Sequence, residues 1–140
     1  MEIKKFENSL IAFDFESEYV NATDLIQAFN KENGTDKRID NYLRKKQTKD
    51  FISALESDTL ISAPDNQLVK RSVNVYGKSE TTWFNKWLAY DFAAWLSPKF
   101  RLFVYKTFDE NLQNRLRWQQ YQIDRFWDKS DNNDLYYRKK

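Results

Sequence analysis

The side chains best suited to acid–base chemistry in this chain are three carboxylates, Asp14, Glu16 and Glu18, at alternate positions in a β-rich run. Alternation in a strand places side chains on one side, where carboxylates could bind Mg²⁺ or share a proton. No lysine lies nearby at a nuclease-like spacing, and a row of solvent-facing acids explains the pattern better. A metal-dependent nuclease is therefore a remote alternative.

The composition excludes most other catalytic chemistry. The 140 residues include no histidine and no cysteine, so Ser/His/Asp and Cys/His nucleophiles, disulfides and histidine- or cysteine-based zinc sites are excluded. The only two glycines, Gly34 and Gly77, cannot build a glycine-rich phosphate loop. We therefore expect no enzyme activity, no metal and no cofactor.

Basic side chains are concentrated in residues 36–49, although the net charge of the whole chain is only +2. If this segment is one helix, Arg38, Asn41 and Lys45 share a face at i, i+3 and i+7. Arginine pairs with guanine edges, asparagine pairs with adenine edges, and lysines anchor phosphates. Tyr42 would flank this face and stack on a sugar or reach a phosphate. The predicted DNA contacts of the segment are Arg38, Asn41, Tyr42, Arg44, Lys45, Lys46 and Lys49. The alternative is an ordinary solvated basic face.

A β-hairpin predicted over residues 68–84, with its turn around Gly77 and Lys78, is the second candidate contact. A hairpin with a basic tip beside a helix can act as a wing on the DNA backbone or minor groove. This adds Lys70, Arg71 and Lys78 to the predicted contacts. The alternative is that these charges only keep a sheet edge soluble.

The elements that must position these residues follow from periodicity and caps. Short strands are expected before residue 21, and a helix capped by Asn21 or Thr23 should end at Gly34. Further helices are predicted over residues 35–46, 48–58, 85–97 and from Pro98 to about residue 118. The predicted fold class is α+β, with small antiparallel strands and a hairpin packed on about five helices, the last of them long.

The last helix carries an apolar stripe at four-residue spacing. Its members are Phe100, Val104, Phe108, Leu112 and Leu116. Ile123 and Trp127 prolong the stripe, so the end of the helix should pack back on the domain or on a second copy. We expect a single domain over residues 1–118, followed by a helix end and a polar, basic tail over residues 119–140. Basic residues and rings mixed in that tail could instead extend a nucleic-acid surface.

Three segments in order resemble the KilA-N domain, the DNA-binding module of phage and large DNA-virus proteins. "YVNATDL" (19–25) resembles the Asn-Ala-Thr signature, and "IDNYLRKKQTKDFISAL" (39–55) resembles the basic helix and the Thr-initiated helix after it. "GKSETTWFNKWLAYDFAAWLSPKF" (77–100) resembles the second half of the module. The likeness covers about residues 9–110. It departs from the family where Asn85 and Lys86 replace His-Pro.

The resemblance implies a winged-helix-like module that binds double-stranded DNA, specifically or generally, without catalysis, in phage or prophage gene regulation. The expected location is the cytoplasm of a bacterial host, with no membrane segment. The alternative is an antirepressor-type module that captures a repressor through exposed rings such as Trp87, Tyr90 and Trp118. A homodimer through the C-terminal helix is also expected.

Overall fold

The computed structural model describes residues 1–58, 67–73 and 80–134, with side chains to residue 128. It divides into two compact units, Met1–Lys106 and Thr107–Lys140. The described part of the first unit contains five strands, four helices and the beginning of a fifth helix, and the described part of the second unit is the rest of that helix. A single domain over residues 1–118 stays a prediction.

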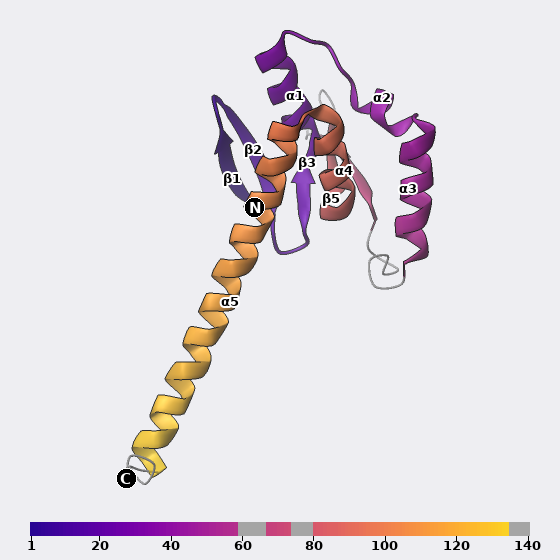
Figure 1. Cartoon of the computed structure of the whole chain (residues 1–140). Coiled ribbons are helices and arrows are strands. Elements are labelled where there is room, and N and C mark those ends of the chain that lie inside the picture. The colour runs from indigo at the N-terminus through magenta and orange to yellow at the C-terminus, as the bar shows by residue number, and fades with distance from the viewer. Residues whose placement is uncertain (59–66, 74–79, 135–140) are drawn as a thin grey trace. The chain divides into compact units, whose positions relative to one another are not determined.

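The predicted α+β fold class is confirmed (Figure 1). The elements in chain order are β1 (Glu2–Phe6), β2 (Ser9–Asp14), β3 (Tyr19–Asn21), α1 (Ala22–Asn33), α2 (Ile39–Leu43), α3 (Lys46–Ser57), β4 (Val69–Val73), β5 (Glu80–Asn85), α4 (Lys86–Leu96) and α5 (Pro98–Asp134). The predicted hairpin appears as β4 and β5, whose turn around Gly77 and Lys78 lies outside the described residues.

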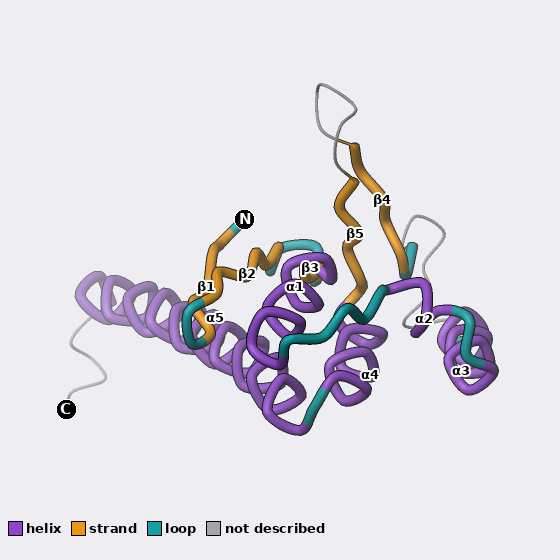
Figure 2. Tube along the Cα trace, turned by 90° about the horizontal axis from the view of Figure 1, so that it is seen from above, coloured by secondary structure: helices purple, strands orange, loops and turns teal. Residues whose placement is uncertain are grey.

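The five strands form one antiparallel sheet in the order β1-β2-β3-β5-β4. Phe13 pairs with Val20 and Val20 pairs with Phe84, so these side chains lie on the same face of the sheet. Figure 2 shows α1 and α4 on one common side of the strands. The Phe13 ring lies 5.8 Å from the Phe103 ring at the start of α5, so this helical side is the core face.

The first turn of α1 completes the hydrogen bonding of two strands. β3 is only three residues long, so β2 and β5 extend past its end without a neighbouring strand. Asp24 Oδ2 accepts from the Ala12 amide of β2, and Thr23 Oγ1 accepts from the Thr82 amide of β5, both at 2.9 Å. Asn21 caps the helix by accepting from the Asp24 amide. We call Asn21, Thr23 and Asp24 the α1 clamp.

The predicted helix boundaries at Gly34, Asn85 and Pro98 are also confirmed. Gly34 ends α1 in the left-handed conformation, with φ of 62°, where a side chain would be strained. Asn85 caps α4 by accepting from the Trp87 amide, and α4 ends before Pro98, which opens α5. These caps fix the boundaries of the two helices on the core face.

Three predicted helices differ from the observed ones. The predicted helix over residues 35–46 is wrong for most of its length, because α2 has only five residues and the chain turns at Arg44 and Lys45. The next helix begins at Lys46 rather than at Thr48, whose side chain is buried. The last helix continues to Asp134, so the polar tail predicted from its composition is helical as far as that residue.

The apolar stripe of α5 is buried over only part of its length. Phe100 and Val104 in the first unit, and Phe108 in the second, are buried as predicted. Leu112 and Leu116 are each 48% exposed, so their assignment to the core is wrong. No described helix is long and apolar enough to cross a membrane.

We expect Asp24→Ala to lower the free energy of unfolding by about 1–3 kcal/mol, because it leaves the buried Ala12 amide without an acceptor. Asp24→Asn keeps an oxygen that can accept and should cost clearly less. Urea denaturation of the two variants beside the wild type measures this difference. Equal stability of all three proteins would show that the α1 clamp does not hold β2.

Candidate nucleic-acid interface

Four exposed cations gather where α2 turns into α3. We call Arg44, Lys45, Lys46 and Lys49 the basic turn; all four side chains are exposed. Arg44 and Lys45 connect the two helices, and Lys46 and Lys49 lie in the first turn of α3. The structure therefore brings four of the ten predicted contacts together on one short segment.

The basic turn lies at the positive end of a helix dipole. The first amides of an α-helix lack intrahelical acceptors, and the aligned peptide dipoles place about half a positive charge there. Among the described residues no side chain caps α3 at Lys45, and its first turn contains no acid. Cations at this end repel the positive end of the dipole and weaken the helix. An anion such as phosphate would accept hydrogen bonds from the free amides, and it would neutralise both the dipole's partial charge and the four cations.

Tyr42 holds the basic turn from inside the protein. Its side chain is 1% exposed, and its ring lies 5.0 Å from Phe92 and 5.5 Å from Trp95 of α4. Its hydroxyl donates to Asp91 Oδ2 at 2.5 Å, and its carbonyl accepts from the Lys45 amide. The prediction that Tyr42 touches DNA is therefore wrong, because a buried ring cannot stack on a sugar. It anchors the turn to α4.

The Tyr42 hydroxyl stays protonated at physiological pH. Burial raises the pKa of Tyr42 far above its ordinary value, and the hydrogen bond to the Asp91 carboxylate raises it further. The protonated hydroxyl can therefore act as the donor to Asp91.

Arg38 and Asn41 are exposed but do not share one helix face with Lys45 as predicted. Arg38 precedes α2 in an extended conformation, with φ of −122° and ψ of 148°, and Lys45 lies beyond the end of α2. The helical spacing assumed for these three residues therefore does not apply. Only Asn41 lies within α2.

The two described cations of the hairpin point to opposite faces of the sheet. Arg71 contacts Glu80 at 2.9 Å and Asp40 of α2 at 3.9 Å, so it faces the side of α2 and its charge is partly compensated. Lys70 lies 4.3 Å from the centre of the Tyr19 ring, in a shallow groove on the face opposite the helices. Lys70 is therefore turned away from the basic turn, and Lys78 lies outside the described residues.

The three carboxylates Asp14, Glu16 and Glu18 do not line one face of a strand as predicted. β2 ends at Asp14 and β3 begins at Tyr19, so Glu16 and Glu18 lie in a turn rather than along a strand as predicted. Hydrogen bonding by Ser17 lowers the pKa of Asp14, and Glu18 pairs with Lys86. Among the described residues no group of three or more acids is gathered to hold a metal ion.

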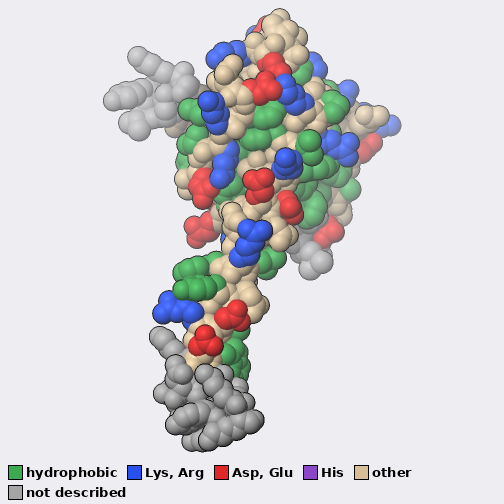
Figure 3. Space-filling model, turned by 60° about the vertical axis from the view of Figure 1, so that its left-hand side comes forward, with side chains coloured by type: hydrophobic (Ala, Val, Ile, Leu, Met, Phe, Trp, Pro, Cys, Tyr) green, Lys and Arg blue, Asp and Glu red, His purple; other side chains and the backbone are tan. Residues whose placement is uncertain are grey.

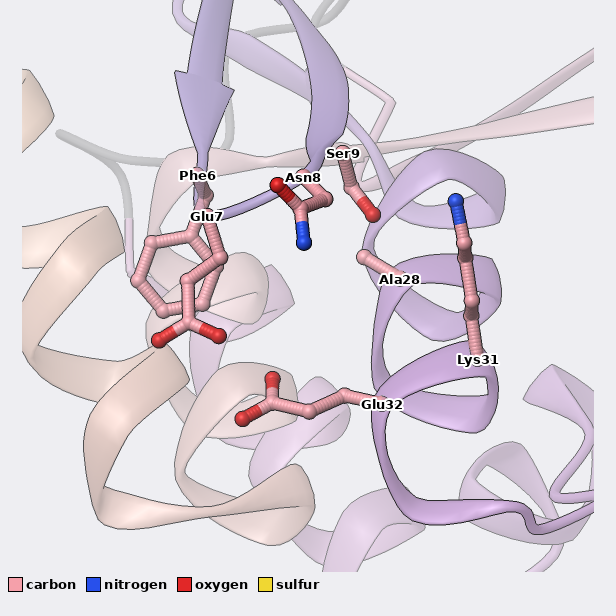
Figure 4. Close-up of a pocket in the computed structure, with 7 residues that line it drawn as sticks. All are labelled: Phe6, Glu7, Asn8, Ser9, Ala28, Lys31 and Glu32. Carbon is pink, nitrogen blue, oxygen red and sulfur yellow. The ribbon is translucent and has the colours of Figure 1, made fainter.

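A small hollow between the β1–β2 turn and α1 also contains two acids (Figure 4). The side chains of Glu7 and Glu32 lie at its rim, and Asn8, Ser9 and Lys31 line it as well. Both carboxylates pair with Lys99, whose pKa is raised by its hydrogen bonds to Glu32 and Glu7. The two acids thus balance a cation, which makes this an ion-pair cluster rather than an acid–base pair.

Two features of the site were missed by sequence reasoning. Asp91 was not recognised as the acceptor for Tyr42, because the two residues are far apart in the sequence. The start of α3 at Lys46 was missed because Thr48 resembled a cap. The sequence did contain one signal for an unusual, purely basic helix start, because no acid lies between Arg44 and Lys49.

Comparison with known proteins gives one match. The family model described as KilA-N domain matches residues 4–114. No curated protein and no solved structure matches the chain.

We expect Tyr42→Phe to destabilise the protein by about 1–3 kcal/mol, because Asp91 loses its donor while the packing of the ring is kept. If Tyr42 only anchors the turn, affinity for duplex DNA should stay near that of the wild type in conditions where both proteins are folded. Denaturation and DNA titration of the same two samples test both expectations. A stable variant with much weaker DNA binding would restore Tyr42 as a direct contact.

The same pair of proteins should differ in alkaline solution. Since the folded pKa of Tyr42 is raised above the unfolded value of 10.0, the stability that it contributes is present below that pH and is lost as the pH rises above it. Above this pH the wild type should lose up to about 1.4 kcal/mol more per pH unit than Tyr42→Phe. Denaturant midpoints over a pH series measure this, and parallel curves would contradict it.

Proposed function

Since this chain belongs to the KilA-N domain family, a family of DNA-binding modules, we propose that it binds double-stranded DNA through the basic turn. DNA binding is the general role that membership of the family gives. The duplex, the contact residues and the biological setting are our proposal.

The observation that carries the proposal is the group of four exposed cations at the uncapped start of α3. Phosphates carry the negative charge of DNA, and each phosphate neutralised by a lysine or arginine releases counterions. The amides at the start of α3 add donors that a phosphate oxygen can accept. A segment that weakens its own helix in the free protein becomes favourable when DNA supplies the missing negative charge.

Arg38 and Asn41 are proposed to read bases beside this phosphate anchor. Both side chains are exposed, one immediately before α2 and one within it. Arginine and asparagine are suited to bidentate contacts with guanine and adenine. Arg71 lies next to α2 through Asp40 and would approach the same backbone. Lys78, which lies outside the described residues, stays a proposed wing contact on the sequence alone. Lys70 is the weakest of the proposed contacts, because it faces the opposite side of the sheet.

The proposed setting is gene regulation by a phage or prophage in a bacterial cytoplasm, without catalysis. Phosphate anchoring gives general affinity for any duplex, and base contacts by Arg38 and Asn41 would add preference for particular sites.

A second candidate is capture of a protein such as a repressor. It is favoured by a partly exposed aromatic cluster on α4 and α5, where the Tyr90 ring packs against Trp87 at 5.7 Å and against Tyr105 at 4.8 Å. Exposed aromatic groups next to an arginine, here Arg101, are typical of binding hot spots. Binding of this kind would be insensitive to salt and to changes in the basic turn. Trp118 in the second unit, which the sequence also suggested, is 61% exposed.

The direct test replaces three cations of the basic turn, Arg44, Lys45 and Lys46, with glutamine and measures affinity for a random-sequence duplex over a salt series. We expect weaker binding and a plot of log affinity against log salt that is shallower by up to about 2.7, the loss of three phosphate contacts. Glutamine keeps helix propensity, so the fold should be retained.

A matched control neutralises three exposed lysines elsewhere, Lys5, Lys31 and Lys106, and changes the net charge by the same amount. Its salt slope should stay close to that of the wild type. If both triple variants weaken binding equally, only the overall charge matters and the basic turn is not the contact. No binding by the wild type at low salt would contradict the DNA proposal itself.

A further inference from the structure

The described part of the second unit is a single helix with an exposed apolar stripe. Leu112, Leu116 and Ile123 are 48–49% exposed, and Phe126 is 63% exposed. Figure 3 shows hydrophobic side chains at the surface of this helix, between charged ones. A helix in water gains most of its stability from packing an apolar face against another surface. We therefore expect a partner to cover this stripe.

The spacing of the stripe is that of a coiled-coil seam. From Leu112 the steps to Leu116, Gln119, Ile123 and Phe126 are four, three, four and three residues. This 3.5-residue repeat keeps one seam facing a second helix, whereas a helix packed on a globular core follows the 3.6-residue period. The partner that the spacing fits is therefore another helix with the same repeat.

Over residues 110–128 the charged residues lie outside the seam. Successive helical residues are turned by about 100°, which places the seam on one half of the helix. The positions that flank the seam are Gln113, Gln120, Gln122, Trp127 and Arg115. The charged residues on the other half are Glu110, Arg117, Asp124, Arg125 and Asp128. With a single charge among the flanks, two copies can approach without bringing rows of like charge together.

We propose that the partner is a second copy of this chain, and that the two copies of α5 pair in parallel and in register along Leu112–Phe126. Gln119 sets the orientation. In a parallel, in-register pair each seam residue meets its own counterpart, so the two Gln119 amides hydrogen-bond to each other. In an antiparallel pair Gln119 would face Leu116 or Ile123 and be buried without a partner, which is costly. The one flanking cation, Arg115, then faces Gln120 of the other copy rather than another arginine.

The rings on the opposite half of the helix have other neighbours. Trp118 stacks on Tyr121 with ring centres 5.9 Å apart, and Arg125 lies 5.7 Å from the centre of the Tyr121 ring. These residues are as exposed as the seam but do not follow its spacing. They provide matched control positions of similar size and apolar character.

The first test is the mass of the full chain in solution, by light scattering or sedimentation over a range of concentrations. The seam is short, so we expect a concentration-dependent change from 17.0 kDa to twice that mass. Leu116→Glu with Ile123→Glu should abolish the dimer, because it buries two like charges on each helix. Trp118→Glu with Tyr121→Glu should leave the dimer intact. A wild type that stays monomeric, or a dimer that survives the seam variant, overturns the proposal.

The orientation is tested by single cysteines, since the wild-type chain has none. Gln119→Cys should form a disulfide-linked dimer rapidly under mild oxidation, because position 119 faces itself across the seam. Asn114→Cys, on the far half of the helix, should remain uncrosslinked under the same conditions. Equal crosslinking of both variants, or none at position 119, overturns the parallel arrangement. Mass and DNA salt slope are separate readouts, so this proposal and the proposed function can fail independently.

Discussion

The structure of the first unit depends on the α1 clamp, the residues Asn21, Thr23 and Asp24. They place the first turn of α1 between β2 and β5, beyond the end of β3. Because β3 is so short, the amides of Ala12 and Thr82 would otherwise be left unpaired, and buried amides without acceptors are costly. Asp24 and Thr23 supply the acceptors at 2.9 Å. One helical turn therefore ties together two strands that do not pair with each other, and it fixes α1 against the sheet.

The candidate interface follows from this arrangement through a chain of contacts. β5 leads directly into α4, whose Phe92, Trp95 and Asp91 form the site that receives Tyr42. Tyr42 in turn holds the carbonyl that accepts from the Lys45 amide. A buried, neutral aromatic contact thus positions an exposed and strongly charged segment. Neither the charge nor the start of α3, which no described side chain caps, helps the free protein to fold, as is expected of residues that serve binding rather than stability.

The elements with local signals could be predicted from the sequence. Asn21, Gly34 and Asn85 act through their own backbone neighbours, so the boundaries that they mark were predicted correctly. The helix over residues 35–46 was predicted too long, because apolar spacing and charge cannot show that the chain turns at Arg44. That turn is set by the long-range contact of Tyr42 with α4. For the same reason, Tyr42 resembled a surface ring in the sequence and is a core residue in the structure.

The cations of the basic turn could be proposed from the sequence, but their place at the start of α3 could not. α2 ends just before Arg44 and α3 begins at Lys46, so the four cations lie at the start of α3 rather than within the predicted single helix. The direct test of the central claim is a map of backbone amide NMR shifts in the labelled protein as duplex DNA is added. We expect the largest changes in the amides of residues 44–49, where phosphate would meet the start of α3. Shifts confined to the Trp87–Tyr90 surface, or to β1 and β2, would contradict the claim that DNA binds at the basic turn.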